Sequence, residues 1–164
     1  MTITETTESS FDKARRKLVA TRIELMGQLA KFSTEELSQC PIKGEWSPLQ
    51  VAHHVYITEG LALEQIQRVQ SEDNPSIADV SADAPQQLVE IAEAPASLEV
   101  ILAGMAARRE ELFEYLSGLP EDVWNRPFQH TEWGDRKFYQ LVNVLSAHDQ
   151  QHTQQLVKIK AALD

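Results

Sequence analysis

Apolar residues recur every three or four positions over most of the chain, the spacing typical of helices that bury one face. The pattern predicts four long helices, at about residues 11–32, 48–69, 97–116 and 135–163. The start of the second helix is well marked. Ser47 can accept a hydrogen bond from the first turn, and Pro48 suits the first helical position. No convincing strand is expected, apart from a short ribbon around residues 128–131.

The segments between these helices determine the predicted fold class. The first and third connections are moderately short and contain the prolines and glycines that end helices. The second, residues 71–95, is much longer and rich in Ser, Asp, Ala and Pro, with a short helix expected at residues 86–92. We therefore predict an all-α protein, a four-helix bundle with a long connection between the second and third main helices.

Length and composition fit a single globular domain. The chain has 164 residues, of which 42% are hydrophobic and 24% charged. This apolar content is sufficient for a core, and the charged fraction is close to the globular average, so disorder is not expected. We expect residues 1–8 to form a flexible N-terminal tail and residues 9–164 to form the bundle domain.

The charge balance bears on partners and location. The net charge is −10, which repels phosphate backbones and anionic lipid at long range. We therefore expect neither nucleic acid nor a membrane as a partner. The acidic N-terminus lacks the features of a signal peptide, and Cys40 is the single cysteine, so no intramolecular disulfide can form. These features predict a cytoplasmic protein.

The candidate chemistry centres on His148 and His152 in the segment HDQQHTQQL. Residues four positions apart share one helix face and lie about 6 Å apart along the axis, so both imidazoles can point at one ion. A buried imidazole without a partner is costly, which favours a shared metal ion. The apolar residues in phase with the two histidines are Leu141, Leu145, Leu156 and Ile159.

A third imidazole is available from His53 or His54 in the segment WSPLQVAHHV. Adjacent helical residues point about 100° apart, so only one of them can join the site, and periodicity does not decide which. Three imidazoles would leave one coordination position open, as in catalytic zinc sites, and they suit Zn, Ni or Fe. His130 is expected to be a surface loop residue, and no nucleotide-binding or HExxH motif occurs.

These motifs resemble the DinB/YfiT-like family of metal-binding four-helix bundles. The resemblance covers about residues 11–160. It rests on the triplet that begins at Trp46, the histidine eight residues later, and the C-terminal pair followed by Gln155-Leu156. The register from Trp46 selects His54 over His53. The resemblance therefore implies a divalent metal ion held by His54, His148 and His152, and commonly a homodimer.

The resemblance also implies an activity, because family members with a known reaction include transferases and isomerases that use low-molecular-weight thiols. Our first hypothesis is a metal-dependent transferase or hydrolase that acts on a small electrophilic molecule, with a thiol as cosubstrate. The alternative is a non-catalytic bundle that binds a metal or a small ligand. In either case Asp149, Gln155 or Glu59 is expected to orient one of the imidazoles.

Overall fold

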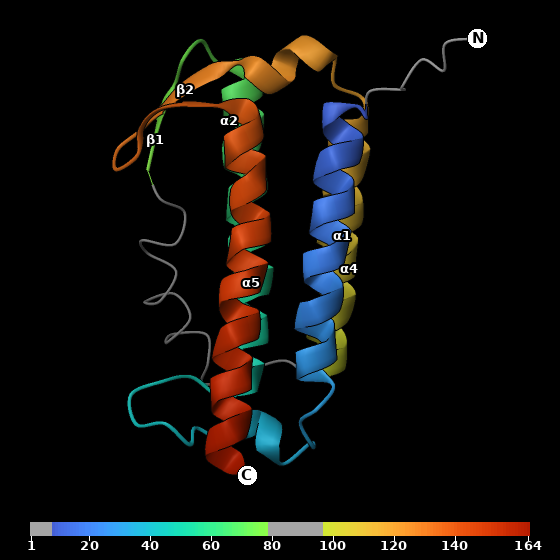
Figure 1. The fold of residues 1–164 in the computed structure, drawn as a ribbon, viewed down its shortest axis with the longest axis vertical. Coiled ribbons are helices and arrows are strands. Elements are labelled where there is room, and N and C mark those ends of the chain that lie inside the picture. Colours follow the sequence, from blue (N-terminus) through green and yellow to red (C-terminus); the bar gives the residue numbers. More distant parts are fainter. Residues whose placement is uncertain (1–7, 79–96) are drawn as a thin grey trace, which may run out of the picture.

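The structure, a computed structural model, describes residues 8–78 and 97–164. Most of this part consists of four long helices, α1 (Ser10–Leu29), α2 (Pro48–Ser71), α4 (Leu98–Ser117) and α5 (Phe138–Leu163). Helices α1 and α5 run in one direction along the bundle, and α2 and α4 run in the other (Figure 1). The predicted four-helix bundle is thus confirmed. Parallel neighbours such as α2 and α4 cannot be joined by a short turn, which explains the long segment between them.

The ends of the helices follow local hydrogen bonding. At the start of α2, the Ser47 hydroxyl accepts from the Gln50 backbone N–H, and the Gln50 side chain accepts from the Ser47 N–H at 2.9 Å. Helix α5 starts at Phe138, three residues later than predicted, because residues 134–137 pair as a strand. Apart from residue 8, the predicted tail at 1–8 and the predicted short helix at 86–92 lie outside the described residues.

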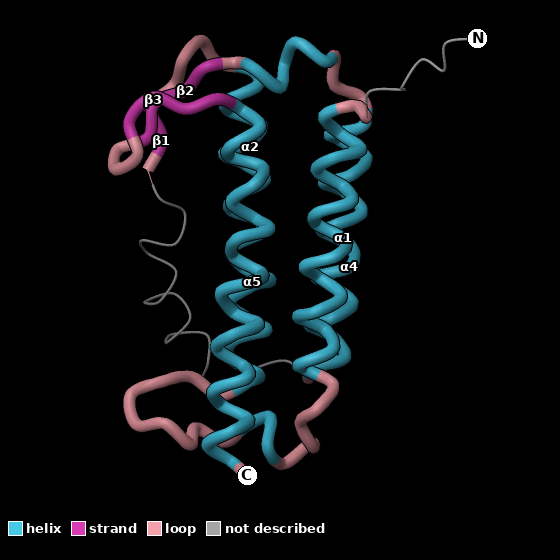
Figure 2. The backbone as a smooth tube through the Cα atoms, in the orientation of Figure 1, coloured by secondary structure: helices cyan, strands magenta, loops and turns pink. Residues whose placement is uncertain are grey.

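A small sheet lies beside the end of α2 and the start of α5, to one side of the bundle (Figure 2). It contains β1 (Ser76–Ile77), β2 (Pro127–His130) and β3 (Gly134–Lys137), in that order. Strand β1 pairs parallel with β2, and β2 pairs antiparallel with β3. The predicted ribbon is confirmed, but the sheet is larger than the sequence indicated. Strands of two to four residues are too short to show a clear alternation of apolar and polar positions.

The apolar core has two halves. The half near the sheet includes Leu18, Ile66, Leu116, Trp124 and Phe138, and the far half includes Leu25, Val55, Met105, Leu156 and Ile159. Helix α1 packs against α5, and helix α2 packs against α4. These contacts enclose both halves of the core. Within the described ranges, no helix combines the length and apolar character that crossing a membrane requires.

A buried layer of charge separates the two halves, and each helix contributes one side chain to it. These side chains are Arg22 from α1, Glu59 from α2, Arg109 from α4 and Asp149 from α5. Asp149 accepts from Arg22 at 3.1 Å and from Arg109 at 3.0 Å. Glu59 also accepts from both guanidinium groups. We call these four residues the charge layer. Two positive and two negative groups leave the layer neutral, so its burial is tolerated.

We expect Arg109→Met to lower the free energy of unfolding by about 3–5 kcal/mol, because it removes one cation and leaves a buried negative charge uncompensated. Chemical denaturation with urea measures this change. Arg108→Met is the matched control. Arg108 lies next along α4 and stacks over the Tyr56 ring at 4.2 Å, so its loss should cost only about 1 kcal/mol. Equal losses in the two variants would contradict a structural role for the charge layer.

Candidate metal centre

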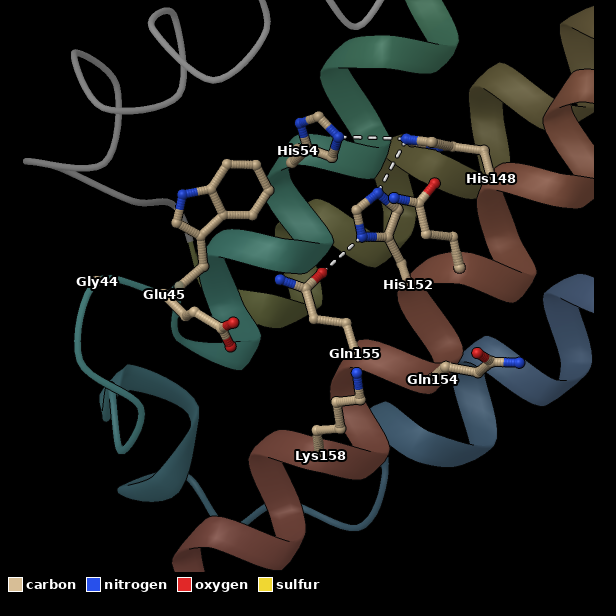
Figure 3. A pocket seen from close by; sticks show the side chains of 10 residues that line it. Gly44, Glu45, His54, His148, His152, Gln154, Gln155 and Lys158 are labelled. Atoms are coloured by element: carbon tan, nitrogen blue, oxygen red, sulfur yellow. Dashed lines mark hydrogen bonds between the residues drawn. The ribbon is translucent and has the colours of Figure 1, made fainter.

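Three histidines meet between α2 and α5 (Figure 3). His54 comes from the first half of α2 and is 4% exposed. Its Nε2 lies 3.2 Å from Nε2 of His148, which lies 2.9 Å from Nε2 of His152. The structure therefore brings together the three histidines expected from the sequence. It also places His54, and not His53, in the cluster.

Hydrogen bonding fixes the protonation of one ring. The Gln155 side-chain oxygen lies 2.7 Å from Nδ1 of His152, so Nδ1 carries the proton and Nε2 presents a lone pair. His148 can then direct a single Nε2 proton at His152 or at His54, but not at both. One of the two short Nε2 contacts is therefore left without a proton between its nitrogens. Without that proton, the lone pairs of the two nitrogens repel each other. A cation bound by all three imidazoles would remove this repulsion.

The three nitrogens fit a divalent ion. Two imidazole nitrogens that bind the same tetrahedral zinc at 2.0–2.1 Å lie roughly 3.3 Å apart. The Nε2 separations of 3.2 and 2.9 Å are close to that spacing. Nδ1 of His54 is buried and has no hydrogen-bond partner in the part of the chain that the structure describes. The residues present therefore fit a divalent ion held by three imidazoles, each through its Nε2 atom.

Burial keeps the cluster neutral. It is the main cause that lowers the pKa of His148 to about 3 and that of His54 to about 4. The neighbouring imidazoles lower both values further. The pKa of His152 is also lowered by burial, but Gln155 and the Asp149 carboxylate act in the opposite direction. All three rings are therefore unprotonated near neutral pH, the form that binds metals.

A cleft of about 550 Å³ opens onto the histidines. Trp46 forms one wall, with its indole 4.7 Å from the His54 ring between centroids. The other wall is the surface of α5. A small molecule that enters this cleft therefore reaches the Nε2 atoms directly. The remaining residues that line it are Gly44, Glu45, Gln151, Gln154, Gln155 and Lys158.

Of the three residues expected to orient an imidazole, Gln155 does so by its hydrogen bond to His152. Asp149 and Glu59 instead belong to the charge layer, where their oxygens bind arginines. The sequence analysis missed the arginines of this layer, Arg22 and Arg109. The sequence does contain a signal for these two arginines. Each of them lies at a position in phase with the apolar residues of its own helix.

The remaining histidines lie elsewhere. His53 is buried, and its ring stacks on Tyr56 at 6.3 Å between centroids. The prediction of His130 as a surface loop residue is wrong. It lies on β2, is 4% exposed and stacks on Trp133 at 3.7 Å. Its Nδ1 accepts from the backbone N–H groups of Glu132 and Trp133, which holds the β2–β3 turn.

The fold and the site together define a four-helix bundle with a three-histidine cluster facing a cleft. The sequence model of the DinB superfamily matches residues 17–156, and the chain belongs to this superfamily. The uncharacterized protein YuaE of Bacillus subtilis is 24% identical over 153 residues, which cover 87% of this chain and 94% of YuaE. The resemblance on which the sequence analysis relied is thereby confirmed.

Solved structures support the same fold. YfiT from Bacillus subtilis, described as a probable metal-dependent hydrolase with an unusual four-helix bundle topology, superposes with a TM-score of 0.79 at 15% identity. The match covers 99% of this chain and 93% of YfiT. The colibactin self-resistance protein ClbS superposes with a TM-score of 0.69 at 10% identity, over 96% of this chain and 98% of ClbS.

The ClbS structure corrects one expectation. ClbS was solved in complex with double-stranded DNA, so a bundle of this fold can bind nucleic acid. The prediction that excluded nucleic acid is therefore wrong. It relied on the net charge of −10, which averages over the whole surface. A nucleic acid contacts one face, whose local charge can differ from that average.

We expect the metal-free protein to lose stability as the pH falls from about 7 to 5. Histidines in the unfolded chain take up protons near pH 6.5, whereas folded His54 and His148 stay neutral well below that value. The unfolded state therefore binds more protons in this range, and the free energy of unfolding decreases with decreasing pH. Urea denaturation at several pH values measures the slope. His148→Gln should reduce it, and a flat profile in the unmodified protein would contradict the analysis.

Proposed function

We propose that this protein is a divalent-metal-dependent enzyme in which His54, His148 and His152 hold a Zn, Ni or Fe ion. The observation that carries the proposal is the convergence of three Nε2 atoms at the base of an open cleft. Three protein ligands with access from solvent are typical of catalytic rather than structural metal sites. The description of YfiT as a probable metal-dependent hydrolase supports the same class.

The bound ion would act as a Lewis acid, which lowers the pKa of a coordinated water to about 7 and deprotonates a coordinated thiol. The protein's own groups prepare the site for this chemistry. Gln155 holds the His152 proton on Nδ1, so that Nε2 stays available. Trp46 shields one side of His54 from water. The charge layer anchors α5 beside α2 and keeps the three rings close.

We propose a thiol-dependent transferase or a hydrolase that acts on a small electrophilic molecule. In the transferase, the thiol loses its proton, its sulfur bonds to the electrophilic carbon, and the leaving group departs. In the hydrolase, water supplies the attacking oxygen. Cys40 is exposed and is not among the residues that line the cleft, so the thiol would be a cosubstrate. A cytoplasmic location, a homodimer and a single domain over residues 9–164 stay predictions.

A non-catalytic metal-binding bundle is the second candidate. It is favoured by the origin of the ligands, because His54 comes from α2 and the other two histidines come from α5. An ion held between two helices would crosslink them and stabilise the fold. Loss of thermal stability on chelation, without turnover on any thiol and electrophile pair, would support this candidate.

We expect elemental analysis of untagged protein to find about one divalent ion per chain. His54→Ala, His148→Ala and His152→Ala should each remove it, since each deletes one ligand. Thiol-stimulated turnover should disappear in His148→Ala. His53→Ala is the matched control, because His53 is the adjacent buried histidine whose ring lies outside the cluster. A folded protein that neither contains an ion nor takes up added zinc or nickel would disprove the proposal.

We expect Gln155→Ala to weaken metal binding by about 10–100-fold, because the His152 tautomer loses its hydrogen-bond partner. Gln155→Glu keeps an oxygen acceptor and should retain most of the affinity. Competition with a chromophoric chelator gives the dissociation constants. Equal affinities in the alanine variant and the unmodified protein would show that Gln155 does not position His152.

A further inference from the structure

The cleft above the histidines is lined by two opposite charges that the proposed metal site does not use. Glu45 lies in the loop before α2, and Lys158 lies on α5 (Figure 3). Neither side chain forms an ion pair with any residue of the described ranges. By contrast, Lys160, two positions beyond Lys158, is paired with Glu36 and Asp164. The two cleft charges are therefore available to a ligand.

Lys158 lines the same cleft as the histidines. It follows His152 by six residues, which is about 9 Å along the helix axis. Helical side chains lean toward the N-terminus, so the ammonium group extends back over the turn that carries Gln155. Glu45 reaches the same cleft from the neighbouring loop, beside the Trp46 indole. A ligand that touches the Nε2 atoms and extends outward thus passes between a cation and an anion.

We propose that this cleft binds a zwitterionic small molecule of the amino-acid type. Its anionic group pairs with Lys158, and its ammonium group pairs with Glu45. A third group, such as a thiolate, meets the ion at the histidines. The side-chain amide of Gln151 adds a further hydrogen-bonding group to the lining. The inference rests on the proposed function, because the third contact requires an ion at the histidine cluster.

Cobalt-loaded protein tests the inference, since a thiolate bound to cobalt gives a charge-transfer absorption band. Three thiols of equal length serve as probes: mercaptohexanoate, aminohexanethiol and mercaptohexanol. We expect Lys158→Gln to weaken mercaptohexanoate about fivefold and Glu45→Gln to weaken aminohexanethiol about fivefold, the effect of losing one partly exposed ion pair. Mercaptohexanol should bind equally to all variants. Lys31→Gln removes the same positive charge as Lys158→Gln, at an exposed position outside the cleft, and should change the binding of none of the three probes.

The outcomes separate this inference from the proposed function. If the protein takes up no cobalt, both are overturned. If cobalt binds but no probe gives the thiolate band, the ligand assignment is overturned while the metal site stands. The ligand assignment is also overturned, while the metal site stands, if all three probes bind the cleft variants with the same change in affinity. It is overturned as well if Lys31→Gln weakens a probe as much as a cleft variant does. Selective weakening of each charged probe by its own variant supports the inference.

Discussion

The arrangement of the bundle depends on a buried layer in which each helix contributes one charged side chain. Removing four charges from water is expensive, and an apolar layer of the same volume would stabilise the fold equally well or better. What the layer provides is geometry, because its ion pairs join one side chain from each of the four helices at a single level of the bundle. Asp149 lies between His148 and His152 in the sequence, so a single turn of α5 contributes both to the layer and to the histidine cluster. The register that satisfies Asp149 therefore also presents both histidines to His54.

The layer shapes the electrostatics of the histidines as well as their position. Arg22 adds to the lowering of the His148 pKa, whereas Asp149 raises that of His152. These two effects on the pKa have opposite signs because His148 is affected by a cation of the layer and His152 by an anion. Burial remains the larger cause in both cases, so the cluster stays unprotonated. Three neutral imidazoles whose Nε2 atoms meet at the base of a cleft are then an electron-rich site, which a cation stabilises.

The sequence predicted those features that repeat over many residues. Long apolar stripes predicted the four helices, and the histidine spacing on α5 predicted two of the three histidines that cluster. The choice between His53 and His54 depended on how α2 faces α5, which periodicity alone does not determine. Strands β1 and β3 escaped detection, as did the inward orientation of His130 beside Phe128. Arg22 and Arg109 were missed because charged residues are usually solvated, although each shares the phase of buried leucines on its own helix.

The comparisons locate where members of this superfamily can differ. YfiT is described as a probable metal-dependent hydrolase, and ClbS was solved with double-stranded DNA, yet both share the bundle with this chain at 15% and 10% identity. A shared fold therefore does not by itself determine what a protein binds. Selection must come from side chains that the bundle does not need for its own stability. In this chain, Glu45 and Lys158 are such side chains, because they are exposed, lie beside the histidines and contribute nothing to the core or to the charge layer. If the cleft binds the zwitterionic ligand proposed above, these unpaired charges, rather than the helices, select that ligand.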